Sequence, residues 1–382
     1  MNSTYLDYNA TAPLRPEARA ALLAALEAPA NPSSVHRFGR AARGIADIAR
    51  RQVADLVGAE ARRVVFTSGG TEANNLALRL ACEAAGVKSL VVAAIEHDSV
   101  LRPACHLGRT TTLPLIEVLA GPEGQIYPAV VAAALAELPK PALVCLMLAN
   151  NETGTIQPVA EVTRLAHAAG ALVLCDAVQA AGKIPVDLAA LGCDFLTLSG
   201  HKLGGPTGVG ALVLRDDWVP APLLRGGGQE QGMRAGTENL PGIAGFGAAA
   251  AAAQQGLYEM KKIAGLRDRL QAALTAACPD APVYGPGAAG TEGRLPNTLC
   301  IGMPGVPAET QVMALDLAGV AVSAGSACSS GKVTPSHVLT AMGLSEQVAR
   351  EAIRFSLGWA SQPEDVERAA AAWIALQQRK RK

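Results

Sequence analysis

The first thing that this sequence lacks is an excess of positive or negative charge. Its 382 residues carry 33 lysines and arginines against 33 aspartates and glutamates, which gives a formal net charge of zero. A protein that binds nucleic acid or an anionic membrane through its overall charge carries a basic excess. We therefore expect no nucleic-acid partner and no membrane partner, and we expect the basic residues 379–382 to be a solvated end.

Targeting and membrane segments are also missing from the pattern. The first eight residues contain neither a basic region nor an apolar stretch, so no signal peptide is expected. The longest apolar runs, such as Ala248 to Ala253, are short, interrupted or rich in alanine, and none predicts a membrane span. These absences favour a cytoplasmic protein.

The eight cysteines occur singly and form no Cys-x-x-Cys pair. Neither a zinc site nor a dense disulfide framework fits that spacing, and a reduced cytoplasmic protein is again the simplest interpretation. Seven of the cysteines lie mostly in apolar or helical runs, where cysteine behaves as a small hydrophobic residue. Cys328 differs, because it lies among the small residues of 323–331, and we expect an accessible and mobile thiol there.

Hydrophobic residues, by contrast, are plentiful. They make up 50% of the chain against 17% charged residues, which permits a large core. From residue 62 onward, short apolar strands alternate with helices, and this predicts an α/β domain with a mostly parallel sheet covered on both faces. The strands are expected at Val64–Phe66, Ser89–Ile95, Thr112–Leu115, Ala142–Leu148, Ala171–Cys175, Phe195–Leu198 and Gly210–Leu214, and helices at Ala41–Val57, Ala73–Ala85, Pro128–Glu137 and Val159–Ala169.

The length predicts two or three domains of roughly 150 residues each. We assign residues 15–255 to the large α/β domain. Residues 1–14 and 256–382 are predicted to form a smaller α+β domain, with strands near 298–303 and 320–323. Ligands of parallel sheets bind at the carboxyl ends of the strands, and polar residues follow several of the predicted strands.

One of these strands ends in Ser199-Gly200-His201-Lys202. A lysine at a rigid strand end beside a solvated loop is held still and yet remains reachable, as a lysine that attacks a carbonyl must be. A surface lysine in an ordinary turn is the alternative. This stretch by itself does not decide between the two.

Three other strand ends carry candidate groups. The turn of residues 68–71 lies between a strand and a helix, which suits either a phosphate cradle or an ordinary capped turn. His97 follows the next strand and is an acid–base group, a ring that stacks on a flat cofactor, or a structural histidine. Asn151 ends a further strand, where its amide either binds a ligand or shapes the turn.

Two charged residues lie within or directly after apolar strands. The carboxylate of Asp176 needs a partner there, and the protonated ring nitrogen of pyridoxal phosphate is one candidate beside a salt bridge or a helix cap. Arg354 lies in the apolar run 353–357, where its planar fork suits a substrate carboxylate or a structural ion pair. The glycine-rich residues 226–239 form either a functional loop or a linker.

Taken in order, these stretches resemble the NifS/IscS-like branch of the cysteine desulfurases, which are pyridoxal-phosphate enzymes of fold type I in the class V aminotransferase group. The resemblance spans nearly the whole chain. The matching stretches are Tyr5-Leu-Asp-Tyr-Asn-Ala-Thr-Ala-Pro-Leu, Asn31-Pro-Ser-Ser-Val-His-Arg-Phe-Gly, Phe66-Thr-Ser-Gly-Gly-Thr-Glu-Ala-Asn-Asn, Glu96-His-Asp-Ser-Val, Asn150-Asn-Glu-Thr-Gly, Cys175-Asp-Ala-Val-Gln, Ser199-Gly-His-Lys, Arg234-Ala-Gly-Thr-Glu-Asn, Gly325-Ser-Ala-Cys and Ile353-Arg-Phe-Ser. The chain departs from the family pattern at Gln231, where an arginine is expected, and at Ala12 and Ala235.

The resemblance implies a role for each matching residue. Lys202 would bond covalently to the cofactor aldehyde, Asp176 would pair with the pyridinium nitrogen, and Gln179 would face the phenolic oxygen. His97 would stack on the ring and shuttle protons. The phosphate would be held by Gly70, Thr71, Ser199, His201 and, from the neighbouring subunit of a homodimer, Thr237.

The substrate side of the site follows from the same resemblance. Asn151 would contact the cofactor and, with Arg354, the substrate carboxylate, while Cys328 would be the nucleophile. The implied activity converts L-cysteine to L-alanine and leaves the sulfur as a persulfide on Cys328, for delivery to an iron–sulfur scaffold or another acceptor protein. Through that persulfide, Cys328 would also be the residue that contacts an iron–sulfur centre transiently.

Other functions remain open at this point. A selenocysteine lyase or another class V enzyme would share most of these residues, and a non-catalytic subunit of iron–sulfur assembly would share the fold. A nucleotide-binding protein is disfavoured, because the dinucleotide fingerprint is absent and residues 325–332 depart from the spacing of a phosphate-binding P-loop.

Overall fold

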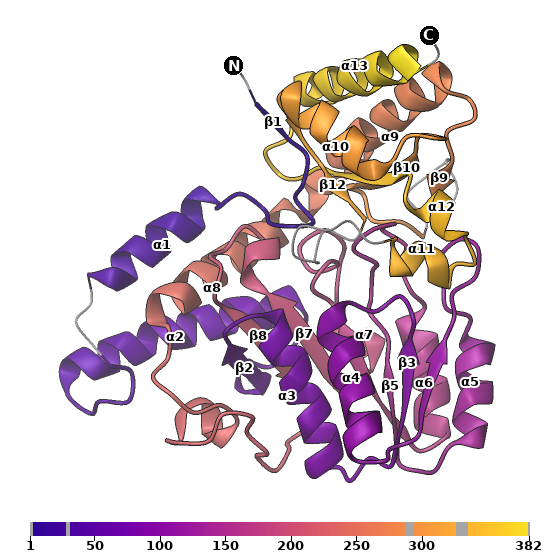
Figure 1. Cartoon of the computed structure of the whole chain (residues 1–382). Coiled ribbons are helices and arrows are strands. Elements are labelled where there is room, and N and C mark those ends of the chain that lie inside the picture. Colours follow the sequence, from indigo (N-terminus) through magenta and orange to yellow (C-terminus); the bar gives the residue numbers. More distant parts are fainter. Residues whose placement is uncertain (1–2, 28–30, 287–292, 326–334, 381–382) are drawn as a thin grey trace.

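The computed structural model describes residues 3–27, 31–286, 293–325 and 335–380, and Figure 1 shows how they are arranged. Its largest sheet has seven strands in the order β2-β8-β7-β6-β5-β3-β4. The five strands from β7 to β4 are parallel to one another, and β8 runs antiparallel to both of its neighbours. The strands are β2 (Val64–Thr67), β3 (Ser89–Ala93), β4 (Leu115–Val118), β5 (Ala142–Cys145), β6 (Ala171–Asp176), β7 (Phe195–Ser199) and β8 (Gly210–Leu214). The predicted α/β class with a mostly parallel sheet is therefore confirmed.

Helices cover both faces of this sheet, because alternate residues of a strand point to opposite sides. In β5, Val144 packs into one core, while Leu143 and Cys145 pack into another on the opposite face. Both faces are buried, which explains why the strands read as nearly continuous apolar runs. The first core includes residues of α1 (Pro16–Leu26), α2 (Arg37–Leu56), α5 (Pro128–Glu137), α6 (Val159–Ala168), α7 (Leu188–Leu191) and α8 (Leu240–Gln255), and the second includes residues of α3 (Gly70–Glu83) and α4 (Asp98–Thr110).

A second group of elements packs around its own core, in the upper part of Figure 1. Leu6 from the N-terminal segment, Phe355 and Trp373 are all fully buried in this core. The N-terminal segment thus contributes to the core of the C-terminal part of the chain. The assignment of residues 1–14 to the smaller domain stays a prediction. The elements are β1 (Thr4–Tyr5) paired with β11 (Val320–Ala321), an antiparallel sheet of β12 (Ser323–Ala324), β13 (Ala352–Ser356), β10 (Thr298–Gly302) and β9 (Val283–Tyr284), and the helices α9 (Met260–Ala277), α10 (Ala308–Leu317), α11 (His337–Ala341), α12 (Glu346–Ala349) and α13 (Pro363–Lys380).

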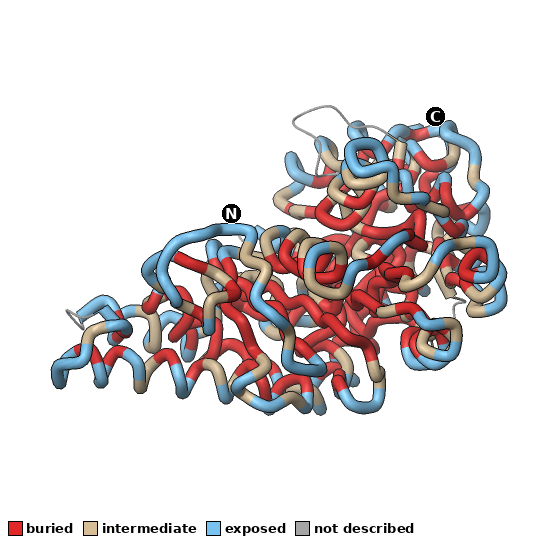
Figure 2. The backbone as a smooth tube through the Cα atoms, turned by 90° about the horizontal axis from the view of Figure 1, so that it is seen from below, coloured by how far each residue is buried: buried red, intermediate tan, exposed pale blue. Residues whose placement is uncertain are grey.

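The seven-stranded sheet and this second group both have buried interiors and exposed outer surfaces, as Figure 2 shows along the backbone. Tyr284, Cys300 and Met342 come from the C-terminal part of the chain, yet they pack into the core of the large sheet. The domain boundary placed at residue 256 therefore stays a prediction. In the described part of the chain, we find no helix with the length and apolarity that crossing a bilayer requires.

Several predicted boundaries were wrong. Strands β3 and β5, for example, end at Ala93 and Cys145 instead of Ile95 and Leu148. Strand β4 begins at Leu115 instead of Thr112, because Thr112 adopts a left-handed backbone with φ of 57°. Helix α2 begins at Arg37, since the His36 side chain caps it by accepting the N–H of Gly39. Helix α3 begins at Gly70, three residues before the predicted start, and this places Gly70 and Thr71 in its first turn.

Candidate active site

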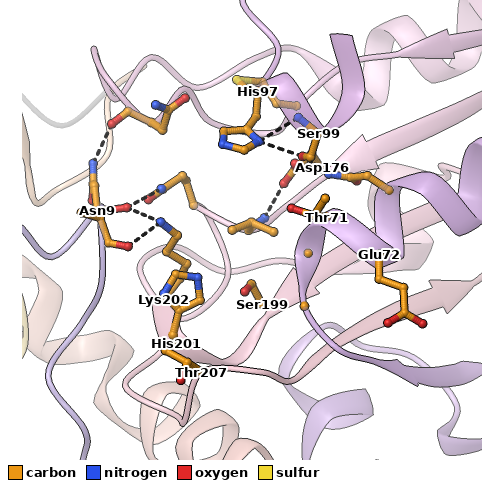
Figure 3. Close-up of a pocket in the computed structure, with 18 of the residues that line it drawn as sticks. Asn9, Thr71, Glu72, His97, Ser99, Asp176, Ser199, His201, Lys202 and Thr207 are labelled. Carbon is orange, nitrogen blue, oxygen red and sulfur yellow. Dashed lines mark hydrogen bonds between the residues drawn. The ribbon is translucent and has the colours of Figure 1, made fainter. Parts of the chain in front are cut away.

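A cavity of about 470 Å³ lies at the carboxyl ends of the central strands, where the two groups of elements meet. Figure 3 shows the side chains that point into it. Ten of the predicted site residues line this cavity, namely Gly70, Thr71, His97, Asn151, Asp176, Gln179, Ser199, His201, Lys202 and Arg354. The fold thus brings together residues that are up to 284 positions apart (354 minus 70).

Lys202 reaches the cavity from a single 3-10 turn, η2 (Gly200–Lys202), that directly follows β7. Its Nζ donates hydrogen bonds to the backbone oxygens of Asn9 at 2.6 Å and Ala10 at 2.8 Å. Figure 3 shows the amine held in this way against the N-terminal segment. The strand end fixes the backbone and the two carbonyls hold the amine at the cavity.

His201 lies beside Lys202 in the same turn and shares a hydrogen bond of 3.0 Å with the Thr11 hydroxyl through Nδ1. Burial, and then the positive charge of Lys202, lower the pKa of the His201 imidazole from 6.5 to about 4. The ring is therefore neutral at neutral pH. It offers one N–H donor and one acceptor instead of a second positive charge next to the lysine.

Asp176 ends β6 and is only 7% exposed. Its Oδ2 accepts a hydrogen bond from Asn74 Nδ2 at 2.9 Å, and its Oδ1 accepts the backbone N–H of Val178 at 2.9 Å. The Asn74 amide is itself oriented, because its oxygen accepts the Thr197 hydroxyl at 2.7 Å. Asp176 is thus held in place by neutral donors, and no positively charged side chain pairs with it in the described part of the chain.

His97 caps helix α4, and its Nδ1 accepts the backbone N–H of Ser99 at 3.0 Å. The Ser99 hydroxyl also lies 2.8 Å from Nδ1 and accepts a hydrogen bond from Asn74 at 2.9 Å. Because Nδ1 acts as an acceptor, the neutral ring carries its proton on Nε2. Burial is the main cause that lowers the pKa of His97, and the neutral ring is therefore the dominant form at neutral pH.

The first turn of α3 forms the opposite side of the cavity. Gly70 and Thr71 contribute N–H groups that have no partner within the helix, at the positive end of the helix dipole. A Cβ on Gly70 would lie 3.1 Å from Val178 and 3.4 Å from Ser199, so the turn packs closely against β7 and the segment after β6. Glu72 would repel an anion here, but its carboxylate is paired with Arg234 at 2.9 Å. This arrangement suits a phosphate group.

Arg354 lies in the middle of β13 and is 3% exposed. Its Nη1 donates to the backbone oxygen of Asn151 at 3.0 Å, and its Nη2 donates to the Asp7 carboxylate at 2.7 Å. Each of these nitrogens carries a second hydrogen, so the guanidinium can still bind a carboxylate at the cavity edge. The Oδ1 of Asn151 is buried and has no hydrogen-bond partner among the described residues.

Nearly the whole chain matches a family of known proteins. The protein-family model described as "Aminotransferase class-V" matches residues 4–369, nearly the full length of the chain. The chain belongs to the class-V aminotransferase family.

Individual members of the family are similar to this chain over almost their whole length. A protein of Cereibacter sphaeroides named "Cysteine desulfurase" is 45% identical over 371 residues, covering 96% of this chain and 94% of that relative. "Cysteine desulfurase IscS" of Dictyoglomus turgidum is 39% identical, covering 95% of this chain and 91% of that relative. Among solved structures, a NifS-like protein from Rickettsia africae superposes with a TM-score of 0.88 at 32% identity, covering 99% of this chain and all of that one.

Of the two remaining predicted residues of this class-V family member, one lines another cavity and one lies outside the described part of the chain. Thr237 is exposed and lines a neighbouring cavity of about 130 Å³, together with Ser68 and Arg234. Cys328 belongs to residues 326–334, which lie outside the described part of the chain. The roles predicted for both residues stay predictions.

Sequence reasoning missed Asn9, which hydrogen-bonds to the predicted site residues Lys202, Gln179 and Asn151. Every polar atom of Asn9 is used: its backbone oxygen accepts Lys202 and Gln179, its backbone N–H donates to Ser356, and its side chain joins Lys183 and Asn297. The amide nitrogen of Asn9 donates in addition to Asn151 and Thr298. Asn9 lies within one of the stretches that carry the family resemblance, and this was the available signal.

Proposed function

We propose that this chain is a pyridoxal-phosphate-dependent cysteine desulfurase that converts L-cysteine to L-alanine and takes up the sulfur on Cys328. The observation that carries the proposal is the arrangement of one cavity, in which Lys202, Asp176 and Arg354 lie around the N-terminus of α3. The names of the relatives support the same activity.

The residues present fit the cofactor. The N–H groups at Gly70 and Thr71 and the hydroxyl of Ser199 would hold the phosphate, and Asp176 would pair with the protonated ring nitrogen. Asp176 suits that partner because the groups that donate hydrogen bonds to it are all neutral. The positive ring nitrogen would therefore balance the negative charge of the buried Asp176 carboxylate. When bound, pyridoxal phosphate supplies an aldehyde that bonds to amines and a ring that spreads the charge left by removal of a proton from carbon.

Arg354 would bind the carboxylate of L-cysteine and so orient the substrate. The guanidinium is already immobilised by Asp7 and Asn151, and little side-chain entropy remains to be lost when the substrate binds. The unpartnered Oδ1 of Asn151 lies at the same edge and would accept a hydrogen bond from a donor of the substrate or cofactor.

Lys202 would then take the proton from the substrate α-carbon on its Nζ, since the amine lies at the bottom of the cavity between β7 and the N-terminal segment. The thiolate of Cys328 would attack the substrate sulfur. The carbon–sulfur bond of the substrate breaks as the new sulfur–sulfur bond forms, and its electron pair stays with the β-carbon, which takes up a proton from solvent. The α-carbon regains the proton held by Lys202, so alanine and a persulfide on Cys328 remain. No external oxidant or reductant is needed for this step.

The partners follow from the same proposal. A homodimer would allow Thr237 of one subunit to reach the phosphate site of the other, and the exposure of Thr237 in the single chain supports this role. The persulfide sulfur would pass to an iron–sulfur scaffold or to another acceptor protein. The cytoplasmic location expected from the sequence stays a prediction.

The test is a direct assay. The purified protein, loaded with pyridoxal phosphate, is incubated with L-cysteine and a thiol reductant, and alanine and sulfide are quantified together. We expect the two products in equal amounts, with L-selenocysteine assayed in parallel to separate this activity from a selenocysteine lyase. The proposal fails if no alanine is formed from L-cysteine.

A further inference from the structure

A second lysine lies directly behind the cofactor site and has no role in the function proposed above. Lys183 is 8% exposed, and its ammonium donates to Gln179 Oε1 at 2.7 Å and to Asn9 Oδ1 at 2.8 Å. Both groups that accept these hydrogen bonds from Lys183 are neutral side-chain amides. Lys183 does not line the large cavity, but together with Lys202 it lines a small one of about 30 Å³, which has room for a single water molecule.

This position is costly for an ammonium group. Burial, followed by the positive charges of Lys202 and Arg354, lowers the pKa of Lys183 well below its usual value. A neutral donor could satisfy the same two amide oxygens without that cost. Perturbed titratable groups gather at functional sites, so Lys183 is a candidate for a functional role.

The hydrogen bonds define the orientation of Gln179. The backbone oxygen of Asn9 has only lone pairs, so it must face the amide nitrogen, and Nε2 lies 3.0 Å from it. This contact excludes the flipped amide, which would place two oxygens against each other. The amide oxygen is thereby left to accept the hydrogen bond of 2.7 Å that Lys183 Nζ donates.

This orientation has a consequence for the cavity, because Gln179 lines it. The nitrogen Nε2 carries two N–H donors, and Asn9 takes one of them. The other remains for an acceptor in the cavity. The hydrogen bond that Lys183 donates to Oε1 also polarises the amide and makes the remaining N–H a stronger donor.

We propose that Lys183 is a positioning residue of the cofactor site, which orients and polarises the Gln179 amide so that its N–H binds the phenolic oxygen of pyridoxal phosphate. This inference rests on the proposed function only in taking pyridoxal phosphate as the cofactor. Asn9 completes the arrangement, since its backbone oxygen binds both Gln179 and the cofactor-binding Lys202.

A double-mutant cycle tests the proposal. Full-length wild type, Lys183→Met, Gln179→Ala and the double variant are purified, and the dissociation constant of pyridoxal phosphate and the absorption spectrum of the bound cofactor are measured without L-cysteine. We expect Lys183→Met to weaken cofactor binding by about ten-fold or more and to shift the absorption maximum. In the Gln179→Ala background, the same substitution should weaken cofactor binding by less than about three-fold, because Lys183 acts through Gln179.

The matched control is Lys262→Met, which removes an exposed lysine from α9 and should leave both measurements at the wild-type values. If Lys183→Met does not fold, Lys183→Gln carries the same cycle, because it keeps N–H donors but loses the charge. The proposal is overturned if the losses of cofactor affinity in the two single variants add up in the double variant. It is also overturned if Lys183→Met leaves the spectrum and the affinity unchanged. A wild-type protein that binds pyridoxal phosphate but forms no alanine would overturn only the proposed function.

Discussion

Arg354 donates a hydrogen bond of 2.7 Å to Asp7, and the two residues are 347 positions apart in the sequence. The arginine side chain is 4% exposed and the aspartate side chain 17%. Asp7 also accepts the hydroxyl of Ser323 at 2.9 Å. The predicted substrate-binding arginine thus depends on the N-terminal segment for its charge balance and for its orientation.

Replacing Asp7 should therefore destabilise the protein. We expect Asp7→Ala to lower the free energy of unfolding by about 3 kcal/mol, because the charge of Arg354 is left buried and unpaired. Denaturant titration of the cofactor-free protein measures this loss. The control is Glu367→Ala, which breaks an exposed pair with Arg269 and should cost less than about 1 kcal/mol. Equal losses in the two variants would contradict the structural importance of the Asp7–Arg354 pair.

Arg354 itself is expected to determine substrate affinity. Arg354→Lys keeps a positive charge but loses the planar fork, and we expect the KM for L-cysteine to rise by about ten-fold or more while the cofactor spectrum is retained. Steady-state kinetics with L-cysteine and an absorption spectrum of the same preparation give both values. A KM equal to that of the wild type would show that the substrate carboxylate binds elsewhere.

Lys202 is expected to be essential for attaching the cofactor. Lys202→Ala removes the amine that lies against Asn9 and Ala10, so the absorbance of the covalently bound cofactor near the edge of the visible range should disappear. Alanine formation from L-cysteine should be lost with it. Normal cofactor absorbance in this variant would disprove the assignment of Lys202.

Cys328 is expected to act after the cofactor has bound. Cys328→Ala should retain the wild-type cofactor spectrum and yet form no persulfide and release no sulfide. Cys105→Ala is the control, since burial and the neighbouring Glu117 raise the pKa of the Cys105 thiol and leave it a poor nucleophile. Persulfide labelling followed by mass spectrometry locates the sulfur. Unchanged turnover in Cys328→Ala would exclude this cysteine as the nucleophile.

His201 predicts a dependence of stability on pH. Its pKa is lowered to about 4 in the folded protein, so between pH 6.5 and about 4 the unfolded chain binds the proton more readily than the folded one. Stability contributed by the neutral ring is present above pH 6.5 and is lost as the pH falls through this window. We expect His201→Asn to flatten the decrease in unfolding midpoint over the same range. Parallel curves for the variant and the wild type would contradict the lowered pKa.

Sequence reasoning pointed to ten residues that line one cavity, because they stand mostly at strand ends and helix starts, where local patterns are clear. Asp176 and Lys202 each follow an apolar strand, and parallel strands must bring their carboxyl ends to one edge of a sheet. Ordinary sequence patterns gave no sign of Lys183. It lies in a turn after Gln179 and does not line the large cavity, so only its contacts reveal its position.

The chain's own pattern of apolar strands and helices determined the α/β class and the sheet with both faces covered, and its resemblance to a known family pointed to ten of the residues around the cavity. The pairing of those residues was decided only in the tertiary structure. Asn9 and Arg354 make their contacts across chain separations that no local pattern encodes. Such contacts depend on how the N-terminal segment lies against both the large sheet and the second group of elements. Whether Arg354 would face a substrate or a buried carboxylate was open in the sequence, and the folded chain shows that the same guanidinium binds Asp7 and lines the cavity.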